Sequence, residues 1–195
     1  MSRELPLILQ LDAAGNPCSW ITYEEAAYYY AKNLVAWTLG DNDYTIYGGE
    51  NSITGTTSSL NLSTIIAVKG RINTGALHRP PALTNRVLFR RDQNVCAYCG
   101  NEFKCEDLTR DHVIPRAQQG LDKWTNVVTA CRSCNQFKDD RTPEQAKMKL
   151  LYVPYAPNRS EYLILRNRTI LADQMKFLLA QVSKNSRLLN PIKLQ

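Results

Sequence analysis

The sequence has no apolar run approaching the roughly 20 residues that span a bilayer, and it contains only two histidines. No internal repeat and no low-complexity tract interrupts it. The first residues show no signal-peptide pattern, so we expect a cytoplasmic protein that does not contact membranes. With 195 residues, the chain is long enough to bury a core, either as one domain with an appendage or as two small domains.

Acidic and basic residues are distributed unevenly along the chain. The net charge is +6, and the isoelectric point is about 9.0. Residues 1–75 hold four Lys or Arg and seven Asp or Glu, whereas residues 76–195 hold twenty and eleven. The positive excess in the last two thirds of the chain favours binding to a polyanion such as nucleic acid, although a solvated basic surface would give the same composition.

Hydrophobic periodicity and turn residues predict an α+β fold in four parts. We expect a small N-terminal α+β domain over residues 1–75, a linker over 76–83, a central domain over 84–151, and a C-terminal helical extension over 152–195 that packs on the core. The predicted strands cover residues 6–11, 44–47 and 63–69, and the predicted helices cover residues 22–38, 84–91, 142–151 and 159–182.

Capping residues mark the predicted helix starts. Thr22 and Glu25 have the spacing of a capping box, and Thr84 can cap a second helix. Thr142 repeats this chemistry, with proline at the first helical position and glutamine at the third. Gly40 is the expected end of the first helix.

Four of the six cysteines form two Cys-x-x-Cys pairs, Cys96 with Cys99 and Cys131 with Cys134. Each pair places two thiolates on one tight turn, and two such turns complete the four-sulfur shell of a structural zinc ion. Such a zinc has no open position for a catalytic water, so its role would be to hold two distant segments together. A redox dithiol is the alternative, but in a reducing compartment two pairs favour metal. We interpret Cys18 and Cys105 as ordinary cysteines.

The segment between the two pairs carries residues suited to phosphodiester hydrolysis. His112 is the candidate general base, because His78 lies in a predicted linker without metal-ligand neighbours. The adjacent Asp111 can bind Mg²⁺, and Asn135 can add a further oxygen ligand. Asn126 can hold the imidazole in one tautomer through its side chain or its backbone carbonyl.

Residues 96–141 resemble the HNH nuclease family, which has a ββα-metal fold. The family pattern of Cys-x-x-Cys, Asp-His-x-x-Pro, Trp-x-Asn and Cys-x-x-Cys-Asn-x-x-Lys is present in full. The resemblance implies that His112 activates water, that Asn126 braces the loop and the base, and that Asp111 and Asn135 bind the catalytic metal. Asn135 stands where many members have histidine, which favours Mg²⁺ or Mn²⁺ over softer ions.

The resemblance implies a DNA substrate, most simply double-stranded, cut by nicking or by double-strand cleavage. Seven basic residues near the motif are candidate phosphate contacts: Arg86, Arg90, Arg91, Arg116, Arg132, Lys138 and Arg141. The alternatives are a zinc-knuckle DNA-binding module without catalysis and an RNA-directed nuclease. Residues 1–75 could direct the nuclease through a homodimer, a protein partner or a modified base, but nothing in them identifies a ligand.

Overall fold

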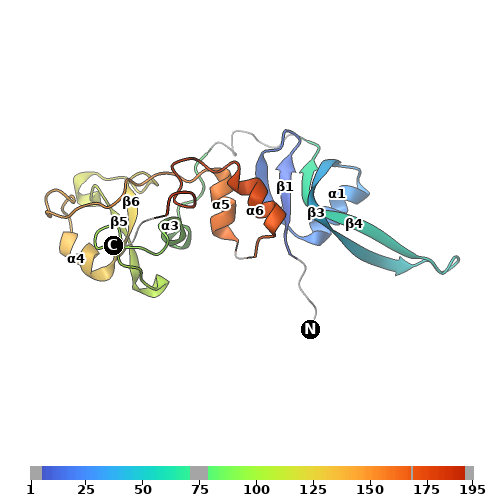
Figure 1. Ribbon diagram of the computed structural model, residues 1–195, viewed down its shortest axis with the longest axis horizontal. Coiled ribbons are helices and arrows are strands. Elements are labelled where there is room, and N and C mark those ends of the chain that lie inside the picture. The colour runs from blue at the N-terminus through green and yellow to red at the C-terminus, as the bar shows by residue number, and fades with distance from the viewer. Residues whose placement is uncertain (1–5, 71–78, 168, 192–195) are drawn as a thin grey trace. The chain divides into compact units, whose positions relative to one another are not determined.

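The computed structural model describes residues 6–70, 79–167 and 169–191, and Figure 1 shows its helices and strands. The chain divides into two compact units, each made of two segments. The first unit comprises Met1–His78 and Asn167–Gln181, and the second comprises Arg79–Arg166 and Val182–Gln195. The C-terminal residues, predicted as a single extension, are therefore shared between the units. His78 and the first residues of the predicted linker, 76–78, lie outside the described residues.

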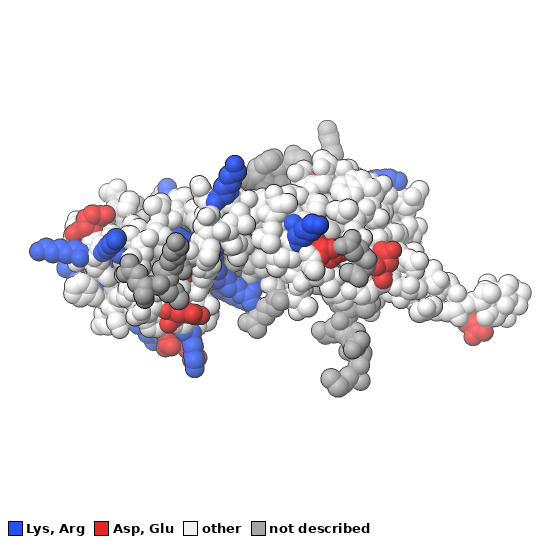
Figure 2. Space-filling model, in the orientation of Figure 1, with Lys and Arg blue, Asp and Glu red and all other residues white. Residues whose placement is uncertain are grey.

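Charged side chains occur on both units. On the face shown in Figure 2, Lys and Arg are interspersed with Asp and Glu instead of forming one continuous basic patch. Among the described residues, no helix has both the length and the apolar composition needed to cross a membrane.

The first unit is built on a four-stranded sheet with the order β2-β1-β4-β3. Strand β1 is antiparallel to β2 and parallel to β4, and β3 and β4 form a long antiparallel hairpin (Figure 1). The helices α1 (Tyr23–Ala31) and α6 (Ala172–Leu179) contact this sheet. The three predicted strands overlap β1, β3 and β4, whereas β2 was not predicted. The strand bounds are Ile8–Asp12, Pro17–Ile21, Val35–Glu50 and Thr57–Val68 for β1 to β4.

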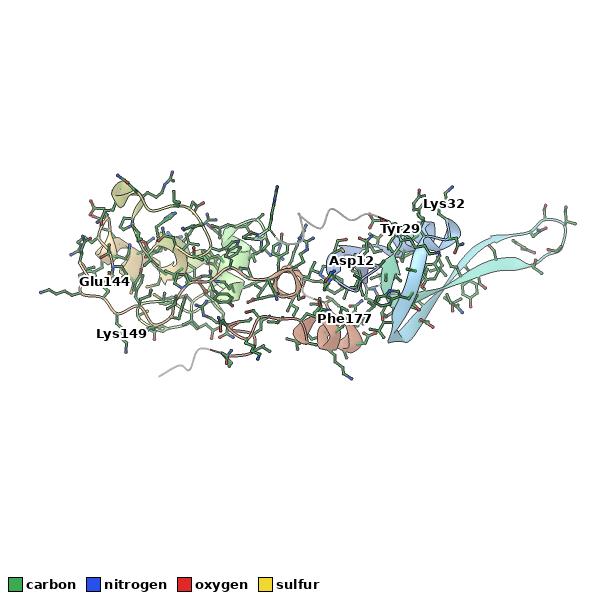
Figure 3. All side chains as sticks on the ribbon, turned by 90° about the horizontal axis from the view of Figure 1, so that it is seen from above. Asp12, Tyr29, Lys32, Glu144, Lys149 and Phe177 are labelled. Carbon is green, nitrogen blue, oxygen red and sulfur yellow. The ribbon has the colours of Figure 1, made fainter. Side chains whose placement is uncertain are left out.

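Helix α1 begins as predicted but ends earlier. The amide of Glu25 donates to the Thr22 hydroxyl, and the Glu25 carboxylate accepts from the Thr22 amide, which completes the capping box. The predicted helix end near Thr38 is wrong, because Asn33 adopts a left-handed conformation with φ of 54° and β3 starts two residues later. Asparagine tolerates this conformation. Tyr29 and Lys32, labelled in Figure 3, mark the end of the helix.

The second unit contains a ββα arrangement. Strands β5 (Leu108–His112) and β6 (Val127–Cys131) pair antiparallel, with Leu108 opposite Cys131 and His112 opposite Val127. Helix α4 (Arg132–Lys138) follows β6 directly. This arrangement confirms the predicted mixed α+β class and its ββα core. Helices α3 (Asn85–Arg91) and α5 (Arg159–Arg166) contact each other in the same unit.

The predictions for the other helices of the chain had different outcomes. Helix α3 and its Thr84 cap are confirmed, and the predicted segment 159–182 forms two helices, α5 and α6. The predicted helix over 142–151 is wrong. Thr142 and Gln145 exchange the hydrogen bonds of a capping box, but only turns follow, and Lys147 has a left-handed φ of 56°. The capping residues therefore start a turn that the following residues do not extend.

Arg91 is the most extensively bonded side chain in the core of the second unit, where it is 1% exposed. Its guanidinium forms an ion pair with Asp92 at 2.8 Å and donates to the carbonyl oxygens of Trp124, Val127 and Tyr155. These bonds join α3, β6 and the segment after residue 151. Arg91 was predicted to contact DNA, and that prediction is wrong because its charge is buried and paired.

We predict that Arg91→Met lowers the free energy of unfolding by about 3 kcal/mol or more, because several buried acceptors lose their donor. The measurement is urea denaturation followed by circular dichroism. Arg86→Met is the matched control, since Arg86 is exposed on the same helix and should change stability by less than about 0.5 kcal/mol. Equal urea concentrations at the midpoint of unfolding for the two variants would contradict the structural role of Arg91.

Candidate functional site

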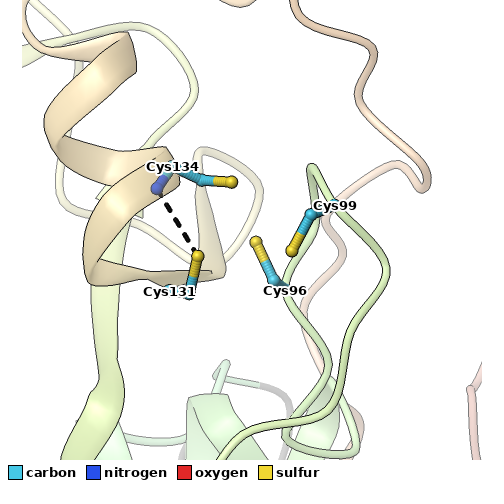
Figure 4. Close-up of side chains that lie close together, drawn as sticks. All are labelled: Cys96, Cys99, Cys131 and Cys134. Atoms are coloured by element: carbon cyan, nitrogen blue, oxygen red, sulfur yellow. Dashed lines mark hydrogen bonds between the residues drawn. The ribbon is translucent and has the colours of Figure 1, made fainter.

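The four predicted metal-binding cysteines lie together (Figure 4). Their Sγ atoms all lie within 4.8 Å of one another, and all four thiols are free of disulfides. Sulfurs bound to one tetrahedral zinc at about 2.3 Å lie about 3.8 Å apart, so small movements would complete the site. The donor set can hold a metal such as zinc. Cys18 and Cys105 lie outside this cluster, as predicted.

Local backbone geometry supports negative charge on the sulfurs. The Cys134 amide donates to Cys131 Sγ at 3.4 Å, drawn as a dashed line in Figure 4, and the Tyr98 amide donates to Cys96 Sγ at 3.5 Å. Burial alone would raise the pKa of Cys96, but backbone hydrogen bonds lower it below the usual value. Burial raises the pKa values of Cys99 and Cys134. Amide donors at sulfur favour thiolate, which is the form that binds metal.

Asp111, His112 and Asn135 line one pocket of about 290 Å³ at the ββα core. The first two residues end β5, and Asn135 lies on α4. Adjacent residues of a flat strand point to opposite faces, but His112 is the last residue of β5, so its side chain can turn toward the pocket. The structure thus places three of the four predicted catalytic residues around one space.

Asp111 is held from two sides. Its side chain is 5% exposed and accepts a hydrogen bond from the Tyr98 hydroxyl. The Lys138 ammonium lies 3.0 Å from the other carboxylate oxygen and also donates to the His112 carbonyl at 2.8 Å. Burial and the neighbouring carboxylate raise the pKa of Tyr98, so it acts as a neutral donor. Each oxygen of Asp111 retains a further lone pair.

Asp122 contacts the imidazole and was not predicted. Its Oδ1 lies 3.0 Å from His112 Nε2. Arg110 donates to both oxygens of the same carboxylate, at 2.9 and 2.8 Å. Hydrogen bonding to Arg110 is the largest cause that lowers the pKa of Asp122. The sequence gives no signal for this contact, because Asp122 lies on an irregular loop whose path no periodicity predicts.

The loop after His112 is fixed by Asn126 and a glycine. The Asn126 side chain accepts from the Ile114 amide at 2.9 Å and donates to the Ile114 and Leu121 carbonyls, both at 3.0 Å. Its backbone carbonyl accepts from the Val113 amide at 2.9 Å. A Cβ at Gly120 would lie 1.7 Å from the Ile114 carbonyl oxygen, so only glycine fits. Asn126 therefore braces the loop, whereas the side chain that contacts the imidazole ring is Asp122.

Asn135 has one side-chain hydrogen bond that orients it. Its Nδ2 donates to the Thr109 hydroxyl at 2.9 Å, and that hydroxyl donates to the Ala130 carbonyl at 3.0 Å. This bond engages the amide nitrogen and leaves the carbonyl oxygen as an acceptor. Asn135 can thus offer an oxygen ligand while its rotamer is fixed by β5 and β6.

The candidate DNA contacts differ in exposure. Lys138 is 1% exposed and paired with Asp111, so its predicted phosphate contact is wrong, as it is for Arg91. Arg90 is half-buried and donates to the Leu165 carbonyl. The four remaining candidates are exposed, and Arg116 also lines the pocket of His112. The exposed set is Arg86, Arg116, Arg132 and Arg141.

Comparison with known proteins agrees with this geometry. Strand β5, strand β6 and helix α4, with a four-thiol cluster beside them, have the arrangement of a ββα-metal core. Residues 96–151 match the family model described as HNH endonuclease. This part of the chain is therefore similar to the HNH endonuclease family.

Among curated proteins, the CRISPR-associated endonuclease Cas9 of Corynebacterium diphtheriae is 30% identical over 104 residues. The match covers 50% of this chain but only 10% of that relative, so the chain spans about a tenth of its length. Among solved structures, the Type II-C Cas9 enzyme from Actinomyces naeslundii matches with 16% identity and a TM-score of 0.29. That match covers 55% of this chain and 13% of that chain, and its TM-score is too low to argue a shared overall arrangement.

We predict that Cys131→Ser releases the metal and abolishes cooperative unfolding of the second unit, since metal binding of this kind contributes about 10–16 kcal/mol. Metal content by mass spectrometry and thermal unfolding by calorimetry measure the two effects. Cys105→Ser is the matched control, because that thiol is exposed and lies outside the cluster. A Cys131→Ser protein with the metal content and unfolding transition of the Cys105→Ser protein would contradict this assignment.

Proposed function

We propose that the second unit is a metal-dependent endonuclease that hydrolyses DNA phosphodiester bonds. The observation that carries this proposal is the meeting of Asp111, His112 and Asn135 in one pocket of about 290 Å³. Attack by water on a phosphate requires a base to take the proton of the water and oxygen donors to hold a metal ion, and this pocket brings such groups together. The match of residues 96–151 to the HNH endonuclease family model supports the same reaction.

The metal of the four-cysteine cluster is zinc in this proposal, and its role is structural. Four thiolates fill a tetrahedral shell, so no position remains for water or substrate. The cluster joins the turn at Cys96 to the start of α4 at Cys131. Because Asn135 lies one residue beyond Cys134, the position of the zinc also fixes the side chain that faces the catalytic pocket.

His112 is the proposed general base, and Asp122 is its positioning residue. Asp122 accepts a hydrogen bond from one ring nitrogen, so the other nitrogen can take a proton from water. Arg110 holds Asp122 through both carboxylate oxygens, which keeps the ring in one orientation. The carboxylate also stabilises the imidazolium that forms when the proton arrives.

The second metal site would be made by Asp111 and Asn135. Their oxygen donors favour Mg²⁺ or Mn²⁺, which would neutralise charge on the phosphate when bound. Tyr98 and Lys138 fix the Asp111 carboxylate, and Thr109 fixes Asn135. These contacts hold the ligands in place before the ion arrives, which reduces the cost of ordering them.

Double-stranded DNA is the proposed substrate. The exposed guanidinium groups of Arg86, Arg116, Arg132 and Arg141 can position it through its phosphates without selecting a sequence. One such site per molecule would nick a strand, and paired sites would cut both. We propose an interaction role for the first unit, through a second copy of the chain or a protein partner.

We predict that His112→Ala lowers the rate of supercoiled-plasmid cleavage in Mg²⁺ or Mn²⁺ by about 10²–10⁴-fold, the usual contribution of a general base. Zinc content and DNA affinity should remain those of the wild type. His78→Ala is the control, because it removes the other histidine of the chain. Undiminished cleavage by His112→Ala would refute the assignment, and a wild-type protein that binds plasmid without cutting it would favour a binding module.

We predict that Asp122→Asn lowers kcat by about 10–100-fold while leaving KM near the wild-type value, because it disturbs the orientation of the base and not DNA binding. Asp122→Glu should restore part of the rate. Asp107→Asn is the control, since Asp107 is exposed and does not line the pocket. If Asp122→Asn and Asp107→Asn cleave equally fast, Asp122 does not position His112.

A further inference from the structure

A second, larger cavity lies in the same unit as the catalytic pocket. Its volume is about 920 Å³, at the upper end of the range of about 300–1,000 Å³ for ligand sites. Three separate segments line it, namely residues 98–101 of the first cysteine turn, residues 149–155 and residues 184–190. Among the described residues, the two pockets have no lining residue in common.

The lining of this cavity is cationic. Lys149, Lys184 and Arg187 contribute to it, and none of its described lining residues is Asp or Glu. Both lysines are exposed, and Lys149, labelled in Figure 3, projects from the second unit. Side-chain amides from Asn101 and Asn185 add neutral hydrogen-bonding groups. A cavity with this charge and polarity suits an anionic ligand that carries hydrogen-bond acceptors.

Arg187 is fixed before any ligand binds. It is 5% exposed, pairs with Asp92, and lies over the Tyr152 ring with its guanidinium carbon 3.5 Å from the ring centroid. Asp92 also pairs with Arg91, so one carboxylate is shared between two guanidinium groups. The guanidinium of Arg187 donates to Asp92 and to the Val153 carbonyl, so Arg187 contributes positive charge to the lining, and the two exposed lysines remain for direct contacts.

Tyr98 connects this cavity to the catalytic pocket. It is among the residues that line the cavity, and its hydroxyl donates to Asp111 of the catalytic pocket. A strand held at the cavity would therefore lie beside the cysteine turn, one tyrosine ring away from the proposed metal ligand. The cavity is too large for a single phosphate group, and its cations come from segments far apart in the sequence, which suits an extended ligand.

We propose that this cavity binds the phosphodiester backbone of a nucleic-acid strand, outside the catalytic pocket, through Lys149 and Lys184. In this role the cavity holds a stretch of nucleic acid that is not being cut, which rests on the proposed function. DNA and RNA share the backbone chemistry, so the charge alone does not separate them. The 2′-hydroxyl and the helical form of the strand distinguish RNA from DNA.

The test compares the double variant Lys149→Ala/Lys184→Ala with the control Lys32→Ala/Lys176→Ala, which removes two exposed lysines of the first unit. Fluorescence anisotropy measures the affinity of the full chain for single-stranded DNA, single-stranded RNA and duplex DNA of one length, without added divalent ions. Loss of two phosphate contacts should weaken binding about 10–30-fold at 0.1 M salt. For single strands it should also make the slope of the log binding constant against log salt concentration shallower by about 1.4. The nucleic acid whose affinity falls most in the cavity variant is the one that the cavity binds.

Cleavage of labelled DNA by the same variants gives the second measurement. The cavity variant should raise KM about tenfold and leave kcat unchanged, because neither lysine lines the catalytic pocket. Affinity within twofold of the control variant in all three arms would overturn the proposal. If the wild type cuts nothing, the endonuclease proposal fails, yet the binding comparison still decides whether the cavity holds a strand.

Discussion

The clustering of four thiols is the constraint on which the geometry of the proposed site depends. The two cysteine pairs lie 31 residues apart in the sequence, yet their sulfurs lie within 4.8 Å of one another. Cys131 ends β6 opposite Leu108, the first residue of β5, so the cluster also fixes the register of the hairpin that ends in Asp111 and His112. A shift of one residue in that register would turn every side chain of β5 to the other face. In the proposed function, metal binding at the cysteines would therefore also set the position of the proposed base, His112.

Buried charges complete this arrangement. Lys138 joins the end of α4 to Asp111 and to the His112 carbonyl, and Arg91 joins α3 to β6 and to the segment after residue 151. Each of these cations has a carboxylate partner and carbonyl acceptors, which is the condition under which a buried charge is tolerated. Such pairs add specificity to a small core, because alternative packings would leave the charges unpaired. The basic character of this unit is therefore partly internal, and only part of it is available to a polyanion.

The sequence predicts the parts of this protein whose chemistry is local. The cysteine pairs, the Asp-His motif and the capping residues Thr22 and Thr84 all act over a few residues, and the structure places them as expected. Long-range properties were not predictable. Whether an arginine such as Arg91 is buried depends on which segments surround it, and Asp122 meets His112 through a loop that Gly120 and Asn126 fold back. The early end of α1 and the absence of a helix after Thr142 both follow from one left-handed residue, Asn33 or Lys147, which competes with helix propensity.

The most direct test of the account is anomalous X-ray diffraction from crystals of the full chain grown with Mn²⁺, recorded at the zinc and manganese absorption edges. We expect one zinc peak at the centre of the four sulfurs and one manganese peak between the Asp111 and Asn135 oxygens, in the pocket that His112 lines. A disulfide or an empty space among the four cysteines would contradict it, as would manganese bound only at other carboxylates.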